Sequence, residues 1–71
     1  MTTFSRLGYT FRSFFDCDVD EMGHIDVEGV EVKDDMGIVI ASVDWAEIEE
    51  LYDMTDDELI EWVCEHEGEG I

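Results

Sequence analysis

The chain has 71 residues, of which 21 are Asp or Glu and three are Lys or Arg, and its formal net charge is −18. This charge excludes direct binding to nucleic acid or to an anionic membrane surface, because phosphate groups would be repelled. With 45% hydrophobic and 11% aromatic residues, the chain is too apolar to be a disordered acidic tail. The length fits a single acidic domain over residues 1–71 and excludes a two-domain enzyme.

Targeting and redox signals are weak in this sequence. It contains no apolar run of the roughly 18 residues that a transmembrane helix needs, and residues 1–8 lack the apolar segment of a signal peptide. Two cysteines, Cys17 and Cys64, can form at most one disulfide. We therefore expect a cytosolic protein with free thiols and no membrane contact. Nothing in the sequence selects between a monomer and a dimer.

The first predicted strand covers residues 7–15. Its large apolar side chains alternate, as in a strand with one buried face. Phe14 breaks the alternation, which predicts either a bulge or a second buried face. The positions expected to face the core are Leu7, Tyr9, Phe11 and Phe15.

Two further strands are predicted at 24–33 and 38–43. In the first of these, the buried set changes phase at Gly29, which predicts a β-bulge at the glycine. The other follows a turn over 34–37 and is apolar almost throughout, which is typical of a strand buried on both faces. The inward positions expected around Gly29 are Ile25 and Val27 before it and Val30 and Val32 after it.

The second half of the chain changes to a helical period. Asp44 is the predicted N-cap of a helix over 45–53, and Thr55 with Glu58 forms a capping box that opens a helix over 56–67. The predicted fold class is therefore α+β, a small three-stranded antiparallel sheet followed by two short helices. The helical residues expected to face the core are Trp45, Ile48, Leu51 and Tyr52, then Leu59, Ile60, Trp62, Val63 and Cys64.

Residues 16–25 have some features of a calcium-binding loop. Acids at 16, 18 and 20 match its first ligands, but Glu21 and Val27 stand where such a loop needs a glycine and a bidentate glutamate. We interpret the segment as a solvated acidic turn, with weak divalent-ion binding as the alternative.

Zinc binding and catalysis are both poorly supported. Cys17, His24, Cys64 and His66 could ligate zinc, but the last two are separated by two positions on a predicted helix and do not face each other. The sequence carries no nucleophile motif and no phosphate-binding loop. We predict no metal site, no cofactor and no enzymatic activity.

The carboxylates form rows on the predicted helices. Asp57, Glu61 and Glu65 recur every four residues and would lie about 6 Å apart along the axis. Like charges at this spacing destabilise a helix by about 0.2–0.5 kcal/mol per pair, and no Lys or Arg follows Lys33. We predict that this surface binds a basic partner. The candidate partner-binding residues are Asp26, Glu28, Glu31, Glu47, Glu50, Asp53, Asp57, Glu58, Glu61 and Glu65.

The small size, the core aromatic residues Tyr9, Phe11, Trp45 and Trp62 and the carboxylate rows are typical of a known class. The likeness in composition extends over residues 16–71. The chain resembles phage-encoded DNA-mimic inhibitors: anti-CRISPR proteins, uracil-DNA glycosylase inhibitors and anti-restriction proteins. Small α+β anti-CRISPR proteins are the most similar. The resemblance implies a folded protein in the host cytoplasm that occupies the nucleic-acid channel of a basic complex, such as a CRISPR effector subunit.

Two other interpretations of the charge stay open. It could be a solvent adaptation to a halophilic cytosol, where molar salt screens self-repulsion, or it could belong to an acidic adaptor that docks a different basic protein.

A partner-binding surface also needs an apolar anchor beside its charges. The candidates, all off the core periodicity, are Phe14, Met22, Met36 and Met54.

Overall fold

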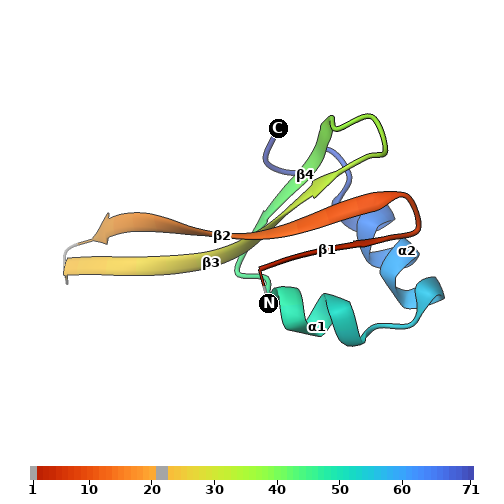
Figure 1. The fold of residues 1–71 in the computed structure, drawn as a ribbon. Helices are drawn as coiled ribbons and strands as arrows, with labels where there is room; N and C mark the ends of the chain where they lie inside the picture. Colours follow the sequence, from red (N-terminus) through yellow and green to blue (C-terminus); the bar gives the residue numbers. More distant parts are fainter. Residues whose placement is uncertain (1, 21–22) are drawn as a thin grey trace.

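In the computed structural model of this chain, the backbone is described for residues 2–20 and 23–71, and the side chains for the same residues except 17–20, 24 and 25. An antiparallel sheet has the strand order β1-β2-β3-β4, and two helices follow it (Figure 1). The α+β class, the antiparallel sheet and the two helices are confirmed, but the sheet has four strands instead of three. The elements are β1 (Thr3–Arg6), β2 (Tyr9–Asp20), β3 (Gly23–Lys33), β4 (Val39–Asp44), α1 (Ile48–Asp53) and α2 (Asp56–His66).

The strand absent from the prediction is β1, which forms a tight hairpin with β2. Leu7 and Gly8 make its two-residue loop, with φ of 56° and 82°, and Arg6 lies opposite Tyr9. Two consecutive positive φ angles are typical of a type I′ turn, whose twist matches that of the flanking strands. Leu7, expected in a strand and in the core, is therefore a loop residue and 43% exposed. With four residues and a single large apolar one, Phe4, β1 is too short to show a clear period.

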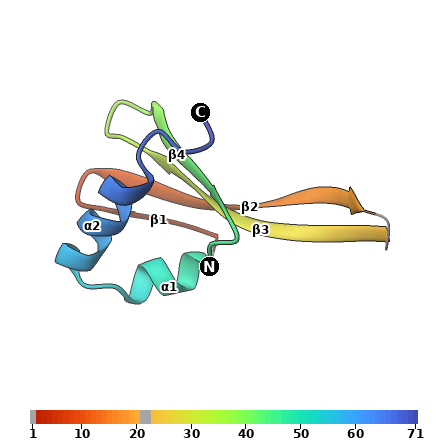
Figure 2. The same ribbon diagram turned by 180° about the vertical axis from the view of Figure 1, so that it is seen from behind.

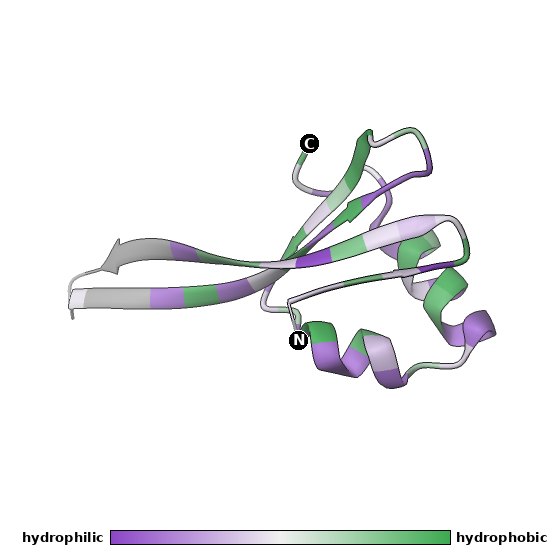
Figure 3. Ribbon diagram, in the orientation of Figure 1, coloured by the Kyte–Doolittle hydropathy of each residue, from purple (hydrophilic) through white to green (hydrophobic). Residues whose placement is uncertain are grey.

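The core lies between one face of the sheet and the helices, with α1 against β2 and α2 against β4 (Figures 1 and 2). Figure 3 shows hydrophobic and hydrophilic residues alternating along both helices, as expected for helices with one buried face. The buried cluster contains Phe11, Val30, Val32, Ala41 and Val43 from the sheet and Ile48, Leu51, Leu59 and Val63 from the helices.

The buried stripe on each helix is narrower than predicted. Tyr52, Ile60 and Cys64 were expected in the core and are exposed. Tyr52 packs edge-on against Phe4, with ring centroids 5.5 Å apart, at the margin of the sheet. Each helix buries about one residue per turn, Ile48 and Leu51 on α1 and Leu59 and Val63 on α2.

Gly29 does not mark a bulge. The β2–β3 register passes it without a shift and places Phe14 directly opposite. The buried set changes phase because Val27 and Val30, three positions apart, lie on opposite faces of an unbroken strand, and both are buried. Phe14 is half-buried over the glycine, so the second buried face is the correct interpretation of its position. The register shift that does occur lies between Val32 and Lys33, in the pairing with β4.

Hydrogen bonds hold both the β3–β4 turn and the outer edge of β4. Asp34 accepts from the backbone N–H groups of Met36 and Ile38, each at 2.9 Å, which confirms the predicted turn. Beyond α2, the N–H of Gly68 donates to the carbonyl of Ile40 and the N–H of Ser42 donates to that of Glu69, both at 2.8 Å. The segment after α2 therefore covers an edge that would otherwise invite strand pairing. The two-sided burial predicted for this strand holds only in part: Ala41 and Val43, which share one face, are buried, but Ser42 on the other face is half-buried, and Ile38 before the strand is exposed.

β2 and β3 extend beyond the rest of the sheet (Figure 1). β1 pairs with β2 up to Arg12 and β4 pairs with β3 from Gly29 onward, so residues 15–20 and 23–28 pair only with each other. We call these two stretches the arm, and they give the molecule its 40 Å length. The predicted acidic turn over 16–25 is wrong for 16–20 and 23–25, which are strand. Glu21 and Met22 lie outside the described residues.

Candidate partner-binding surface

The carboxylate row on α2 exists as the sequence predicts. Asp57, Glu61 and Glu65 all lie within the helix and are exposed, and successive residues are about 6 Å apart along its axis. On α1, Glu50 and Asp53 are exposed and three positions apart. Neither helix contains Lys or Arg to offset these charges.

Glu58 is exposed on α2 and also caps the start of this helix. Its Oε1 accepts hydrogen bonds from the backbone N–H of Thr55 at 3.2 Å and from the Thr55 hydroxyl at 3.0 Å. The N–H of Glu58 donates to Thr55 Oγ1 at 3.3 Å, which completes the predicted capping box. The backbone and side-chain hydrogen bonds from Thr55 hold the pKa of Glu58 below its usual value of 4.5.

This lowered pKa predicts an acid-sensitive contribution to stability. A group with a depressed pKa in the folded state stabilises the fold above its unfolded-state pKa and loses that effect as the pH falls through the folded-state value. We expect Glu58→Gln to lower the thermal midpoint at pH 7, with the difference from the wild type shrinking below about pH 4.5. Thermal melts from pH 3 to 7 measure this. Glu61→Gln, on the same helix outside the box, controls for the loss of one charge, and an equal, pH-independent effect of both variants would contradict the role of the box.

Contrary to the prediction, Glu47 is not part of the carboxylate row on α1 but lies beside carboxylates of the arm. The helix begins at Ile48, and Glu47 precedes it as an N-cap residue without a side-chain capping bond. The predicted N-cap, Asp44, is instead the last residue of β4. Glu47 lines a depression of about 250 Å³ whose other lining residues are Asp26, Glu28, Trp45 and Ala46. The fold thus brings together carboxylates from the arm and from the segment before α1.

Glu31 lies apart from the other candidates. Asp26 and Glu28 alternate in phase with Val30 and share the face of the sheet that carries the helices, whereas Glu31 has the opposite phase. Its Oε1 lies 3.6 Å from Lys33 Nζ. The predicted continuous array of Asp26, Glu28 and Glu31 is therefore split between two faces.

Two of the three Lys and Arg residues are engaged in structural contacts. Lys33 lies beside Glu31, and Arg6 reaches the connection between the helices. The Arg6 guanidinium donates to the carbonyls of Tyr52 at 3.3 Å and Met54 at 2.8 Å, and it forms an ion pair with Asp56. Of these two cations, Arg6 joins the sheet to the helices, whereas Lys33 contacts a residue of its own strand.

Besides Tyr52, two aromatic residues that the sequence placed in the core are exposed, Phe15 and Trp45. Phe15 shares the inner face of β2 with Phe11, as its alternation predicts, but it is 71% exposed because it lies four residues further along, in the arm. Trp45 is 75% exposed because the chain turns there, before the helix begins. Its φ of 62° lies in the left-handed region, which costs a bulky residue about 1–2 kcal/mol.

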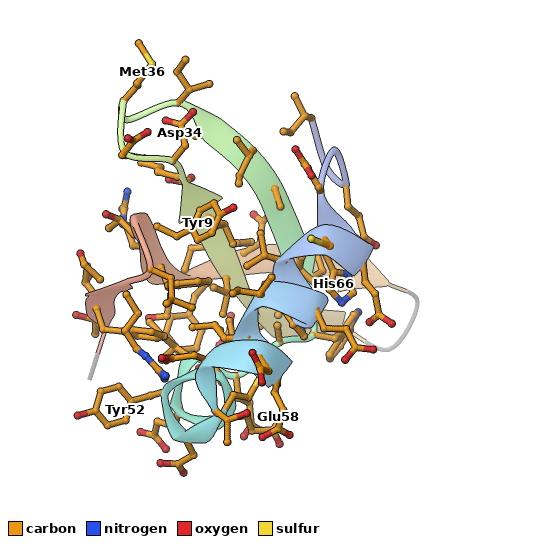
Figure 4. The ribbon with its side chains drawn as sticks, turned by 90° about the vertical axis from the view of Figure 1, so that its right-hand side faces the viewer. Tyr9, Asp34, Met36, Tyr52, Glu58 and His66 are labelled. Carbon is orange, nitrogen blue, oxygen red and sulfur yellow. The ribbon has the colours of Figure 1, made fainter. Side chains whose placement is uncertain are left out.

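The predicted apolar anchors fit less well. Phe14 and Met54 are half-buried, Met54 against the core cluster. Met36 is 80% exposed, but it lies in the β3–β4 turn, at the opposite end of the molecule from Glu58 in Figure 4. Among the described side chains, Phe15 and Trp45 are therefore the large exposed apolar residues beside the acidic residues of the arm.

The side chains that could ligate zinc do not assemble in the described part of the chain. Cys64 is exposed, and His66 Nδ1 lies 2.5 Å from Glu69 Oε2. The Cys17 and His24 side chains lie outside the described residues. Among the side chains that are described, no group of three or more His, Cys, Asp or Glu residues is arranged to hold a metal ion.

Across residues 2–20 and 23–71, no helix has the length and apolar character needed to cross a bilayer. No family model, curated protein or solved structure matches the chain.

Proposed function

We propose that this protein is a DNA-mimic inhibitor that occupies the basic nucleic-acid-binding surface of a host defence nuclease complex, acting in the host cytoplasm as an anti-CRISPR protein that blocks target DNA binding. The observation that supports this most directly is the exposure of its carboxylates on ordered elements. Of the ten candidate residues, Glu28 and Glu31 are half-buried and the other eight are exposed. Those eight are Asp26, Glu47, Glu50, Asp53, Asp57, Glu58, Glu61 and Glu65.

The proposed mechanism is competition for basic residues. Lys and Arg side chains that normally contact phosphates would pair with the carboxylates of α1, α2 and the arm. Opposite fields of this strength steer the two proteins together and raise the association rate. In a CRISPR effector the relevant surface holds the short recognition duplex or the channel for the heteroduplex. The same surface would serve against a uracil-DNA glycosylase or a restriction enzyme, and the protein needs no cofactor for this mechanism.

The carboxylate rows on the helices favour the interpretation that this surface was selected for binding. The alternative is that the fold merely tolerates the charge. Each like-charged pair four residues apart destabilises its helix, whereas a Glu–Lys pair at the same spacing would stabilise it. Asp57, Glu61 and Glu65 keep the unfavourable arrangement along the whole of α2. A protein selected only for stability would place Lys in this row.

A DNA-displacement assay tests the proposal. Purified CRISPR effector–guide complexes, a uracil-DNA glycosylase and a restriction enzyme would each be incubated with a labelled target duplex, and the protein would be titrated in at 50 and 200 mM salt. We expect it to displace DNA from a CRISPR complex, with weaker inhibition at higher salt. Substituting Glu47, Glu50 and Glu61 by Gln and Asp57 by Asn should weaken inhibition about 100-fold or more, because close interfacial charge pairs couple strongly.

A matched control removes the same number of charges elsewhere. Asp35, Asp44, Glu67 and Glu69 are exposed and lie outside both the helix rows and the arm. Substituting these four by Asn or Gln gives a control variant with the same net charge as the test variant. This control variant should inhibit nearly as well as the wild type. Equal inhibition by the wild type and the variant substituted at Glu47, Glu50, Asp57 and Glu61 would contradict the electrostatic mechanism.

Thermal melts separate mimicry from solvent adaptation. A mimic that works in an ordinary cytoplasm should melt cooperatively in about 50 mM salt, whereas a halophilic protein should be folded only near molar KCl, where the Debye length is about 3 Å. Unfolding at low salt would favour the halophilic interpretation over the proposal. Displacement of DNA from the glycosylase or the restriction enzyme alone would reassign the target within the same mechanism.

A further inference from the structure

The two most exposed aromatic side chains of the described residues flank one carboxylate. Phe15 lies directly opposite Glu28 in the β2–β3 register. Glu28 in turn lines the depression together with Trp45. Both rings therefore neighbour Glu28, which is half-buried between them at the base of the arm.

Glu28 and the two rings lie where the helices leave the sheet uncovered. The inner face of the sheet is covered by α1 and α2 only up to the base of the arm, and the arm continues past them (Figures 1 and 2). The segment from Trp45 to Glu47 runs along this boundary, just before α1. The result is an inside corner lined by Asp26 and Glu28 from the arm and by Trp45, Ala46 and Glu47 from the segment before α1. Phe15 lies beside it on the neighbouring strand, opposite Glu28.

The residues that line this corner determine which kind of ligand can bind there. An apolar peptide would cover the carboxylates of Glu28 and Glu47 without offering them a hydrogen-bond donor, which is strongly unfavourable. An anion would be repelled, and the described carboxylates are not arranged to hold a metal ion. An arginine side chain satisfies both parts of the lining, because its planar guanidinium stacks on aromatic rings and donates to carboxylates at the same time.

We propose that this corner binds an arginine side chain of the protein's basic partner, with the guanidinium against Trp45 and paired with Glu28 and Glu47. This inference rests on the proposed function for the existence of a basic partner, and it adds the residue type that the partner presents. The helix rows supply long-range steering, and the corner supplies a partly desolvated anchor of the kind that dominates binding energy. Trp45, held in an unfavourable backbone conformation at the surface, provides its aromatic wall.

NMR titration with short peptides tests the site without the partner. The probes are an acetylated, amidated pentapeptide with Arg between glycines and its Lys and Gln counterparts, followed by the indole N–H signals of Trp45 and Trp62. We expect the Arg peptide to shift the Trp45 indole and the amides of Phe15 and Glu28 saturably. The Lys peptide should bind about threefold to fivefold more weakly, and the Gln peptide should cause no saturable shift. Trp62, half-buried on α2, is the internal control.

Two variants remove the site by independent routes. Trp45→Gly should fold with a thermal midpoint at least as high as that of the wild type, because glycine adopts φ near 62° without strain, and it should weaken Arg-peptide binding about tenfold. Glu28→Gln with Glu47→Gln should weaken it similarly. Met36→Ala, which truncates an equally exposed apolar side chain elsewhere, should bind as the wild type does.

Three results would overturn the arginine site: unchanged binding in Trp45→Gly, equal affinity for the Arg and Lys peptides, or shifts as large on α2 as at Trp45. The assay also separates this inference from the proposed function. Specific peptide binding without inhibition of any DNA-binding complex would contradict the proposed function alone. Full inhibition by both site variants would contradict the arginine site alone.

Discussion

Replacing Arg6 by Met is expected to lower the free energy of unfolding by about 2–3 kcal/mol, because hydrogen bonds to a charged group contribute about 1.5–3 kcal/mol. The Arg6 guanidinium donates to the carbonyls of Tyr52 and Met54, which lie at the C-terminal end of α1. That end carries no basic residue of its own, and a cation there satisfies the free carbonyls and the helix dipole. Arg6 also pairs with Asp56 in the first turn of α2, so one side chain fixes both helices to the sheet.

Chemical denaturation and thermal melts measure this effect. The expected loss corresponds to a fall in the thermal midpoint of roughly 10–20 °C for a domain of this size. Arg12→Met is the matched control, because it removes the same charge from an exposed position on β2 and should cost less than about 1 kcal/mol. Methionine keeps the apolar stem of the side chain, so packing changes little. Equal stability of the two variants would show that the contacts of Arg6 contribute nothing beyond its charge.

Features set by neighbours in the sequence could be predicted. The Thr55–Glu58 capping box and the start of α2 depend on residues three positions apart, and both are correct in detail. The burial of Phe11, Val30 and Val32 follows from local alternation in two strands. Each of these features is decided within one turn or one strand, so a short window of sequence contains the information.

Features set by distant packing could not be predicted. Phe15 has the alternation of a core residue, and its exposure depends on where α1 and α2 stop covering the sheet. The contacts of Arg6 join residues 46 to 50 positions apart, and no local pattern connects them. The corner formed by Glu28, Trp45 and Glu47 likewise exists only because β3 and the segment before α1 meet in space.

One signal for the arm was present in the sequence and was interpreted wrongly. Residues 16–20 alternate Asp with Cys or Val, which is the period of a strand. The density of acids made an acidic turn the simpler interpretation, because turns are usually polar. In a two-stranded arm that no helix covers, neither face has to be apolar, so acids are compatible with strand. The alternation was therefore the better guide than the composition.

Replacing Gly29 by Ala is expected to lower the free energy of unfolding by about 2 kcal/mol, although the substitution is favourable in most strands. Gly29 does not have a positive φ, so the glycine is needed for space and not for conformation. A Cβ at this position would lie 2.4 Å from Phe14 Cζ and 2.6 Å from the Val43 carbonyl oxygen. The ring can move aside, but the backbone oxygen cannot move without disturbing the β3–β4 pairing.

The same substitution should change how the arm is presented to a partner. Gly29 is the last β3 residue paired with β4 before the arm begins, and Phe14 covers it on the face opposite to Phe15. Displacing the Phe14 ring should therefore shift the amide signals of Phe15 and Glu28 and weaken binding of the Arg peptide. In a double-mutant cycle, Phe14→Ala should cost less in the Gly29→Ala background, with a coupling of about 0.5–1 kcal/mol. The coupling should stay below the full cost, because the Val43 contact remains. Additive effects of the two substitutions would show that the ring does not occupy the space above Gly29, and the base of the arm would then be held by β4 alone.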